Sequence, residues 1–341
     1  MIRATYELEP HGAAEELARI ESTGLPWGPR AVRAHVVSES GGRAVVDFPE
    51  ANWDADATLL VSAIFAGEWA DSAAFSRCRL VEVEWPDGLL PGPAFDAPDR
   101  VLVGAIVKPS LGLSPREVAE TAGALARGGA DLVKDDELLG DPEWCRLEER
   151  VRRVVAAIPG EVRYAANVTG PAESLLRRAA RAVDLGAGAL MVNAFAQGLG
   201  SLSMLREAEL RVPIFAHGVG AAFWARGREF GVARAVIAEL TRLCGADYVQ
   251  VGSFSGTVSD TPDEVRGQIR ACHRSLGVAR AIAVLGGGIG PRNARAQVEL
   301  AGVESGVMVL LGSAAYEGGS PEDAVRATVE SLRPKSAAES A

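Results

Sequence analysis

The chain has 341 residues, 48% of them hydrophobic and 23% charged, which is ordinary for a globular protein of one or two domains. Its formal net charge of -10 argues against a nucleic acid or an anionic membrane as partner, because both require clustered Lys and Arg. No signal-length apolar core begins the chain, so we expect a cytoplasmic protein. No CxxC spacing occurs, which predicts buried free thiols at Cys78, Cys145, Cys244 and Cys272.

Residues 1–95 predict a small α+β domain of ferredoxin-like type. We expect strands over residues 2–8, 31–37, 43–48, 58–65 and 79–85, and a helix over residues 13–22. The second and third strands form a hairpin that turns on Gly41 and Gly42. A helix-backed antiparallel sheet is the simplest arrangement, and the Pro- and Gly-rich residues 86–98 are interpreted as a linker.

Residues 96–335 alternate strand and helix with a period of roughly 30 residues, the length of a βα unit. Ser114 and Thr261 begin capping boxes that mark two of the helices. The predicted fold class is therefore α/β, a C-terminal (β/α)8 TIM barrel, with a doubly wound sheet as the alternative. Residues 336–341 are expected to be a disordered tail. The eight predicted strands are residues 101–108, 131–134, 163–168, 189–193, 213–217, 248–251, 281–285 and 307–311.

The ends of these strands are polar or glycine, which predicts an active site, because barrel enzymes place their chemistry at this rim. Asp136 and Glu137 follow the second strand and suit Mg²⁺, although a solvated loop explains two adjacent acids equally simply. Lys134 either pairs with these acids or adds CO₂ to become a carbamate that supplies a third oxygen ligand. The other strand ends are Lys108, Asn167, Asn193, His217, Gln250, Gly286–Gly288, Gly312 and Ser313.

The last two strand ends predict a phosphate site. Gly287 and Gly288 precede a helix after the seventh strand, and Gly312 and Ser313 follow the eighth, where barrels bind phosphate through backbone N–H groups. A tight turn that only requires glycine is the alternative. We expect a phosphorylated small-molecule substrate, whereas His217, considered alone, could equally be a packed core histidine.

Two segments give the chain a family resemblance. Residues 129–137, preceded by residues 104–113, resemble the large subunit of RuBisCO and the RuBisCO-like proteins. The resemblance implies that Lys134 is the carbamylated lysine and that Asp136 and Glu137 are the other Mg²⁺ ligands. It implies that Lys108 lies near the enolising carbon of the substrate, and that His217 faces the substrate. Gly287, Gly288, Gly312 and Ser313 would then bind its phosphate.

The family resemblance also implies a homodimer with active sites at the interface. The N-terminal domain would then bring Glu21, Ser22, Thr23 and Glu68 to the partner's site. Asn167 and Gln250 are further candidates for contact with the substrate.

Departures from the pattern of the carboxylases predict that this chain does not fix CO₂. Ser110 and Gly218 replace a lysine and an arginine, Gln250 replaces a histidine, and residues 253–258 lack the lysine of the mobile loop. Glu68 stands where the family has an asparagine. The chemistry that remains is enolisation, with Lys108 as the first candidate for the base and the Lys134 carbamate or Glu68 as alternatives.

The leading hypothesis is a Mg²⁺-dependent enolase, isomerase or β-keto acid decarboxylase acting on a phosphorylated, sugar-like substrate. A catalytically degenerate binding or regulatory protein is the alternative. A residual carboxylase acting on a ribulose bisphosphate is a third hypothesis.

Overall fold

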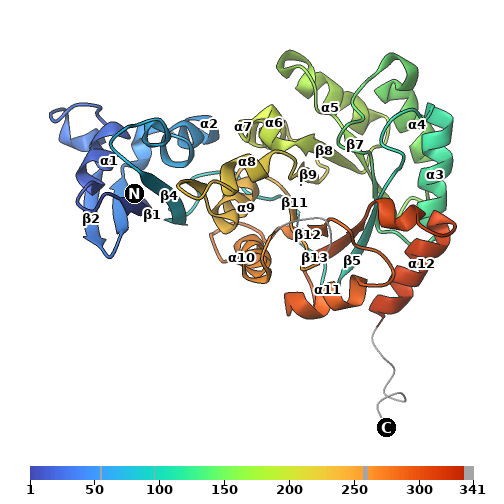
Figure 1. Cartoon of the computed structure of the whole chain (residues 1–341). Helices are drawn as coiled ribbons and strands as arrows, with labels where there is room; N and C mark the ends of the chain where they lie inside the picture. Colours follow the sequence, from blue (N-terminus) through green and yellow to red (C-terminus); the bar gives the residue numbers. More distant parts are fainter. Residues whose placement is uncertain (54–55, 96, 256–259, 334–341) are drawn as a thin grey trace, which may run out of the picture.

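The computed structural model describes residues 1–53, 56–95, 97–255 and 260–333, and two sheets organise this part of the chain (Figure 1). Within these residues, eight parallel strands close into a barrel in the order β11-β12-β13-β5-β6-β7-β8-β9. Five further described strands form a separate sheet in the order β10-β4-β1-β3-β2. The predicted TIM barrel with an N-terminal sheet domain is confirmed, and closure of the barrel excludes the doubly wound alternative.

All eight predicted barrel strands occur in the structure, with ends that differ by two residues at most. They are β5 (Leu102–Ile106), β6 (Leu132–Lys134), β7 (Arg163–Asn167), β8 (Ala189–Asn193), β9 (Ile214–His217), β11 (Tyr248–Val251), β12 (Ile282–Gly286) and β13 (Val307–Leu311). The helices outside them are α3 (Pro115–Arg127), α4 (Leu147–Ala157), α5 (Leu175–Asp184), α6 (Ala194–Gln197), α7 (Gly200–Glu207), α8 (Ala221–Ala225), α9 (Arg234–Leu243), α10 (Pro262–His273), α11 (Ala294–Ala301) and α12 (Pro321–Leu332).

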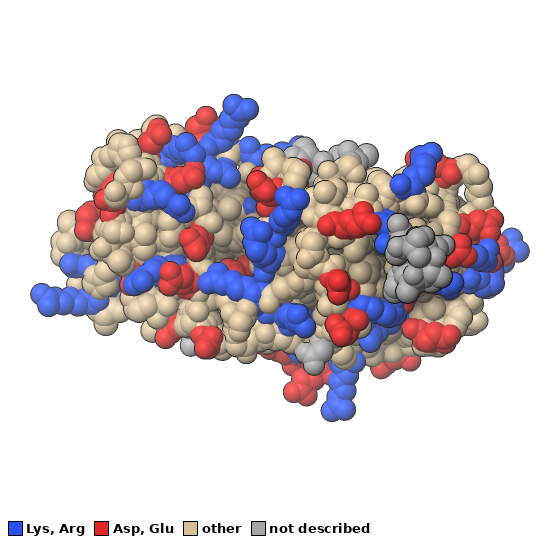
Figure 2. All heavy atoms as spheres, turned by 90° about the horizontal axis from the view of Figure 1, so that it is seen from below, with Lys and Arg blue, Asp and Glu red and all other residues tan. Residues whose placement is uncertain are grey.

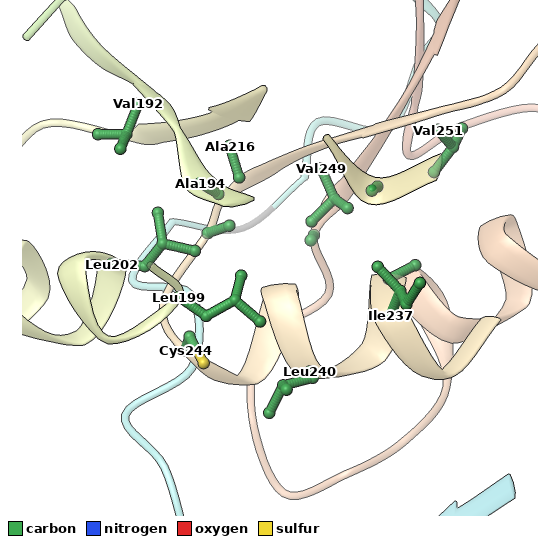
Figure 3. Packing of buried hydrophobic residues seen from close by; sticks show 14 of the residues in the cluster. Val192, Ala194, Leu199, Leu202, Ala216, Ile237, Leu240, Cys244, Val249 and Val251 are labelled. Carbon is green, nitrogen blue, oxygen red and sulfur yellow. The ribbon is translucent and has the colours of Figure 1, made fainter. Parts of the chain in front are cut away.

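Two different sets of side chains fill the inside and the outside of the barrel wall. The interior set is buried and comes from alternate residues of each strand, such as Met308 and Leu310 of β13, or Leu102 and Ile106 of β5 with Gly104 between them. Because successive strand residues point to opposite faces, the residues between them pack outward against the helices. Figure 3 shows this outer layer, where Val249 and Val251 of β11 face Ile237 of α9. The barrel is thus a packed core, and its polar groups are confined to the rims.

The helix starts confirm the capping predictions. The Ser114 and Thr261 side chains each accept a hydrogen bond from the backbone N–H of the third helical residue, Glu117 or Glu264. The carboxylate of that Glu in turn accepts the backbone N–H of Ser114 or Thr261, so both capping boxes are complete. Ser320 caps α12 through the N–H of Asp323. These caps fix where each helix begins, and hence the length of the βα loops that carry the site.

The N-terminal sheet consists of β1 (Ile2–Glu9), β2 (His35–Ser40), β3 (Arg43–Phe48) and β4 (Arg77–Glu84), with α1 (Ala14–Ile20) beside it. A strand predicted over residues 58–65 is wrong, because α2 (Ala57–Leu60) and a π-helical turn (Val61–Phe65) occupy this segment. Asp56 caps α2 by accepting from the N–H groups of Thr58 and Leu59. A short continuous apolar run fits a buried helix as well as a strand, and the cap decides between them. The second strand also begins later than predicted, because a 3₁₀ turn covers Arg30–Val32.

The fifth strand of this sheet comes from the barrel half of the chain. β10 (Phe230–Val232) pairs in parallel with β4, where Phe230 lies opposite Cys78, so the expected purely antiparallel sheet is corrected to a mixed one. Residues 86–95 are bound to the barrel as well. The N–H of Gly92 donates to Leu243 O at 2.8 Å, and the N–H groups of Ala94 and Phe95 donate to the Asp247 carboxylate.

Residue 96 and residues 334–341 lie outside the described part of the chain. The predicted boundary between residues 95 and 96, and the predicted disordered tail at 336–341, therefore stay predictions.

The predicted state of the four cysteines is confirmed, since all are buried and free. Among the described residues, no helix is both long and apolar enough to cross a membrane. On the face seen from below in Figure 2, acidic and basic side chains are interspersed.

Candidate active site

Neighbouring barrel strands bring the predicted site residues together at their carboxyl ends. Lys108 follows β5, residues 134–137 end and follow β6, and Asn167 ends β7, and these three strands are adjacent in the barrel. His217 ends β9 on the far side of β8. Parallel strands share one edge, so residues separated by more than a hundred positions meet there.

Lys108 forms an ion pair with Asp136 in the site. Its Nζ donates to Asp136 Oδ2 at 2.5 Å and to Ser110 Oγ at 2.9 Å, while its side chain stays 22% exposed. The backbone N–H of Lys108 donates to the hydroxyl of Tyr316 at 3.1 Å, and that hydroxyl donates to Ile106 O at 2.9 Å. The ammonium therefore lies in the rim opening on a backbone that Tyr316 holds in place.

Lys134 is the most deeply buried of the ionisable residues predicted for the site. Its side chain has no exposed surface, its Nζ donates to Asp135 O at 2.8 Å, and it lies 5.8 Å from the ring centre of Phe215 inside the barrel. Burial lowers the pKa of Lys134 to about 8, although Glu137, Asp136 and Asp135 act in the opposite direction. An amine with this pKa is partly neutral near pH 7, which is the state that reacts with an electrophile.

The adjacent acids Asp135 and Asp136 point in different directions. The Asp135 carboxylate accepts from Tyr164 Oη at 2.6 Å, from Arg150 Nε at 3.1 Å and from the N–H of Asn167 at 2.9 Å. The Asp136 carboxylate instead faces Lys108. Burial opposes ionisation of Asp136, but the hydrogen bonds from Lys108 and from the N–H of Leu138 outweigh it and lower the pKa of Asp136. Asp135 thus belongs to the framework, and Asp136 belongs to the site.

Two amides hold the loop that presents Glu137. Asn167 Nδ2 donates to Asp136 O at 3.3 Å and to Glu137 O at 3.2 Å, and Asn193 Nδ2 donates to Glu137 O at 2.9 Å. The Glu137 carboxylate stays 26% exposed and lies 3.4 Å from His217 Nε2. Asn167 was predicted as a contact for the substrate, but the amide in this structure is engaged with the loop.

His217 is kept neutral. Its Nδ1 accepts the N–H of Val219 at 3.2 Å, and burial, with Lys134 and Lys108 nearby, lowers the pKa of His217 well below its ordinary value. Gln250 Oε1 accepts the N–H of Gly218 at 3.4 Å, so Gln250 lies beside the residue that follows His217. The strand ends of β9 and β11 therefore offer neutral polar groups to the barrel mouth.

The two glycine loops flank a cavity of about 520 Å³ lined by Gly288, Gly290, Asn293 and Ser313. Gly287 and Gly288 have positive φ values of 107° and 74°, which L-residues with side chains rarely adopt. Asn293 organises the loop, because its Nδ2 donates to Gly288 O and its Oδ1 accepts the N–H of Gly290. Gly312 has a negative φ, and a Cβ added there would make only an ordinary contact with Ile106 at 3.7 Å, so this position does not require glycine. Ser313 begins a 3₁₀ turn.

Glu21 follows α1 and Glu68 begins a 3₁₀ turn, so both belong to the N-terminal domain, which lies beside the barrel in Figure 1. The Glu21 carboxylate is buried and accepts the N–H of Trp69 at 2.6 Å. Burial raises the pKa of Glu21 to about 7 against the opposing hydrogen bond from Trp69, and the charge of Glu68 adds to the rise. Glu68 begins a 3₁₀ turn over Glu68–Ala70. Their predicted role in a partner's site stays a prediction.

The donor set suits Mg²⁺ if Lys134 is modified. Within the described residues, no three His, Cys, Asp or Glu side chains gather closely enough to hold a metal ion. Asp136 and Glu137 supply two hard carboxylate donors, and Mg²⁺ usually takes one or two together with water and substrate oxygens. A carbamate on Lys134 would bring the anionic side chains to three, and the neutral form of the buried amine makes that reaction accessible.

The lysine content of the chain is a further signal for this site. Of the 35 Lys and Arg residues only three are lysines, namely Lys108, Lys134 and Lys335. Arginine cannot lose its proton in a protein, so it replaces lysine in ion pairs but not in proton transfer or carbamate formation. Both lysines of the described residues lie in the site. Tyr316 was also missed, since nothing in a Tyr at the end of a 3₁₀ turn indicates its contact with Lys108.

The chain is thus a TIM-barrel protein with lysines and carboxylates at the ends of β5 and β6 and glycine loops after β12 and β13. Residues 93–283 match the family model of the ribulose bisphosphate carboxylase large chain, catalytic domain. The chain belongs to this family and is a RuBisCO-like member of it.

Curated relatives of similar sequence include a ribulose bisphosphate carboxylase-like protein of Allochromatium vinosum, 33% identical over 69% of this chain and 55% of the relative. The 2,3-diketo-5-methylthiopentyl-1-phosphate enolase of Geobacillus kaustophilus is 34% identical over 76% of this chain and 65% of the relative. The chain thus spans between about half and two thirds of the length of these two relatives.

Solved structures share the fold over 97% of this chain. The RuBisCO-like protein of Alicyclobacillus acidocaldarius is 27% identical with a TM-score of 0.82, over 93% of its own chain. The octameric RuBisCO of Pyrococcus horikoshii has a TM-score of 0.88 at 24% identity, over 87% of its chain, which is a likeness of fold alone.

Proposed function

We propose that this chain is a Mg²⁺-dependent enzyme of the enolase type, an isomerase or lyase, which enolises a phosphorylated, sugar-like substrate and does not fix CO₂. The observation that carries the proposal is the buried Lys134 beside Asp136 and Glu137, with Lys108 in contact with Asp136. A protein kept only for ligand binding has no need of a buried amine whose pKa is lowered to about 8.

Mg²⁺ held by Asp136, Glu137 and the Lys134 carbamate would supply positive charge where the substrate's carbonyl oxygen becomes negative. The chain's own residues include a base for the substrate's α proton. Lys108 Nζ lies at the rim within reach of solvent and next to the carboxylates. Once its ammonium leaves Asp136 and releases a proton to solvent, the neutral amine can take the proton that leaves the α carbon. Ser110 Oγ and the Tyr316 hydroxyl hold the side chain and backbone of Lys108 for this transfer.

The phosphate of the substrate would bind at the loops after β12 and β13, where Gly288, Asn293 and Ser313 line the cavity and Gly287 precedes it in the chain. His217, held neutral, can hydrogen-bond a substrate hydroxyl without competing for the metal's charge. The name of the Geobacillus kaustophilus relative describes a phosphorylated diketone that is converted to an enol, and this supports the same class of substrate here.

The absence of carboxylation is part of the proposal. The residues that depart from the carboxylases are Ser110, Gly218 and Gln250, and the structure places all three at the ends of β5, β9 and β11. Residues 256–259 of the loop after β11 lie outside the described residues, and its described parts, residues 252–255 and 260–261, contain no lysine.

A homodimer with shared active sites also belongs to the proposal. A solved RuBisCO from Hyperthermus butylicus is described as dimeric. Large apolar side chains are exposed on the rim loops of this chain, including Leu111, Leu138, Trp144 and Phe223, the last 93% exposed. A second copy covering this rim would bury them. A cytoplasmic location fits the four free cysteines.

Exchange of substrate protons with D₂O tests the function directly, because exchange reports enolisation whatever the final product. Purified protein with Mg²⁺ and bicarbonate is incubated with a panel of keto phosphates, and deuterium at the α carbon is followed by NMR. We expect Mg²⁺-dependent exchange that Lys134→Ala abolishes, and no incorporation of labelled CO₂ into ribulose bisphosphate. Lack of exchange across the panel would count against the proposal.

A further inference from the structure

A groove of about 870 Å³ lies where the N-terminal sheet meets the outside of the barrel. Its lining comes from Val81–Val83 of β4, from α9 and α10, and from residues 301–303 after α11. The described residues that line it include none of the proposed active site. A volume of this size is typical of small-molecule sites. A ligand bound here would contact both halves of the chain.

Much of this lining is apolar. Val83, Val236 and Ile269 are buried residues that contribute to it, and Ala235 and Val303 are half-buried. Among the described strands, β10 pairs with β4 only as far as Leu80, so no strand covers β4 beside the groove. An apolar group that covered this surface would gain from leaving water.

The charged part of the lining is mainly cationic, although the whole chain has a net charge of -10. Arg266, Arg270 and Arg274 line the groove, against the carboxylates of Glu82 and Glu239. Arg266 and Arg270 are four residues apart on α10, about 6 Å along its axis and on one face, and Arg274 directly follows the helix. The groove therefore attracts anions.

The three arginines differ in what they already bind. Arg266 pairs with Asp263 at 3.2 Å, and Arg274 pairs with Glu239 at 3.1 Å. Arg270 is exposed, and in the part of the chain that the structure describes its guanidinium has no hydrogen bond or ion pair. This guanidinium is available for an anion, and the arginines one turn away on either side add to its positive potential.

Gly267 leaves space beside Arg270. It lies inside α10, where glycine is less favourable than alanine. A Cβ at this position would meet Ala235 Cβ at 3.5 Å and Arg270 Nη2 at 3.9 Å, which are ordinary contacts. The packing of α9 on α10 therefore does not require glycine here. A larger side chain, in contrast, would fill the groove next to the Arg270 guanidinium.

We propose that this groove is a second ligand site, which binds a small organic phosphate. The phosphate pairs with the Arg270 guanidinium, and an apolar or aromatic body lies on Val83, Val236 and Ile269. A phosphate monoester carries a charge of about -1.5 to -2 near pH 7, so it suits a position between two further arginines better than a carboxylate does. This site does not rest on the proposed function.

Three fluorinated probes test the site by ¹⁹F NMR titration of the whole chain. They share one aromatic ring and are 4-fluorophenyl phosphate, 4-fluorobenzoate and 4-fluorophenol. We expect the phosphate to bind about tenfold or more tighter than the phenol, because only the phosphate forms charge-assisted hydrogen bonds, and also tighter than the benzoate. Inorganic phosphate should compete weakly, because it lacks the body that covers the apolar lining.

Two variants and two matched controls locate the binding. Arg270→Gln should weaken the binding of 4-fluorophenyl phosphate about tenfold or more, and Gly267→Leu should do the same by filling the space beside Arg270. Arg177→Gln removes an exposed arginine of α5 and should leave the affinity unchanged. Gly267→Ala, whose methyl group makes only ordinary contacts, should retain the affinity as well.

The phosphate loops of the barrel also bind phosphate in the proposed function, so only affinity that depends on Arg270 counts for the groove. Wild-type affinity in Arg270→Gln would overturn the proposal, and so would a phenol or a benzoate that binds as tightly as the phosphate ester. None of these measurements depends on turnover. The groove can therefore stand if the enolase proposal fails, and the enolase proposal can stand if the groove binds nothing.

Discussion

The ammonium of Lys108 lies 2.5 Å from Oδ2 of Asp136, so the residue proposed to move the substrate's proton is the ion-pair partner of a residue proposed to hold Mg²⁺. A cation that binds Asp136 must compete with this ammonium. The pair keeps the Asp136 carboxylate ionised, and the same ammonium also donates to Ser110 Oγ.

Replacement of Lys108 should separate metal binding from catalysis. Lys108→Met removes the competing ammonium, so we expect Mg²⁺ to bind about threefold to tenfold tighter, which corresponds to roughly 1 kcal/mol. Proton exchange should fall by about 10²- to 10⁴-fold, the usual effect of losing a general base. Calorimetry and NMR exchange measure the two effects. Arg127→Met, which removes an exposed pair with Glu322, is the matched control and should change neither.

Carbamylation of Lys134 is testable because lysine is so rare in this chain. With ¹³C-bicarbonate and Mg²⁺ we expect one carbamate resonance in the ¹³C NMR spectrum, absent in Lys134→Arg and retained in Lys335→Arg. Since the pKa of Lys134 is lowered to about 8, roughly a tenth of the amine is neutral at pH 7, and the signal should grow as the pH rises from 7 to 9. A resonance that persists in Lys134→Arg would refute the assignment.

Substitution of Asp135 should reduce stability, whereas the same substitution of Asp136 should reduce Mg²⁺ binding. Asp135→Asn breaks a fully buried pair with Arg150 and is expected to lower the free energy of unfolding by about 3–5 kcal/mol. Asp136→Asn should cost little stability but abolish Mg²⁺ binding. Urea unfolding and calorimetry distinguish them, and equal loss of stability in both variants would contradict the different orientations of the two carboxylates.

The stability of the N-terminal domain should depend on pH through Glu21. Its folded-state pKa of about 7 lies above the ordinary value of 4.5, so the folded state binds more protons between these values. The stabilising contribution of the protonated carboxyl is full below about pH 4.5 and is lost as the pH rises through 7. We expect the free energy of unfolding to decrease over this range by on the order of 2 kcal/mol, and Glu21→Gln to flatten the profile. Parallel profiles for the two proteins would exclude this role.

Tyr316 should act as a positioning residue. Tyr316→Phe removes the hydroxyl that joins Ile106 O to the N–H of Lys108, which should destabilise the fold by about 1–2 kcal/mol. It should also lower kcat for exchange while KM stays nearly constant, because the phosphate loops are untouched. A rise in KM alone would argue that Tyr316 binds the substrate instead.

The barrel was predictable because its signals are local and repeated. Each strand is a short buried run, and Ser114 and Thr261 mark helix starts by the spacing to their capping partners. The apolar run over residues 58–65 has no polar and apolar alternation that would separate a helix from a strand, and only the Asp56 cap indicates the helix. β10 was not predictable, since three residues pair with a strand about 150 positions away and gain their order from that contact.

The sequence predicted which residues would hold Mg²⁺, and this stays a prediction, but it did not predict how their side chains are oriented. Successive residues of the segment 134–137 are expected to point in alternate directions. The sequence does not show that Asp135 contacts Arg150 and that Asp136 contacts Lys108. These contacts depend on which helix and strand pack behind the loop. The family resemblance supplied this distinction. A cavity of about 330 Å³ that His217 and Gln250 line was unpredictable for a similar reason, because residues from several elements define it together.

The short strand β10 joins the end of β9, where His217 lies, to the N-terminal sheet. α8 follows β9 and leads into β10, and Arg79 of β4 donates to the backbone oxygens of Ala225 at the end of α8 and of Gly227 in the connection. The N-terminal sheet therefore anchors the segment that follows His217. A change in how this sheet is seated, whether by mutation or by assembly, would reach the rim through α8 without replacing any residue of the site.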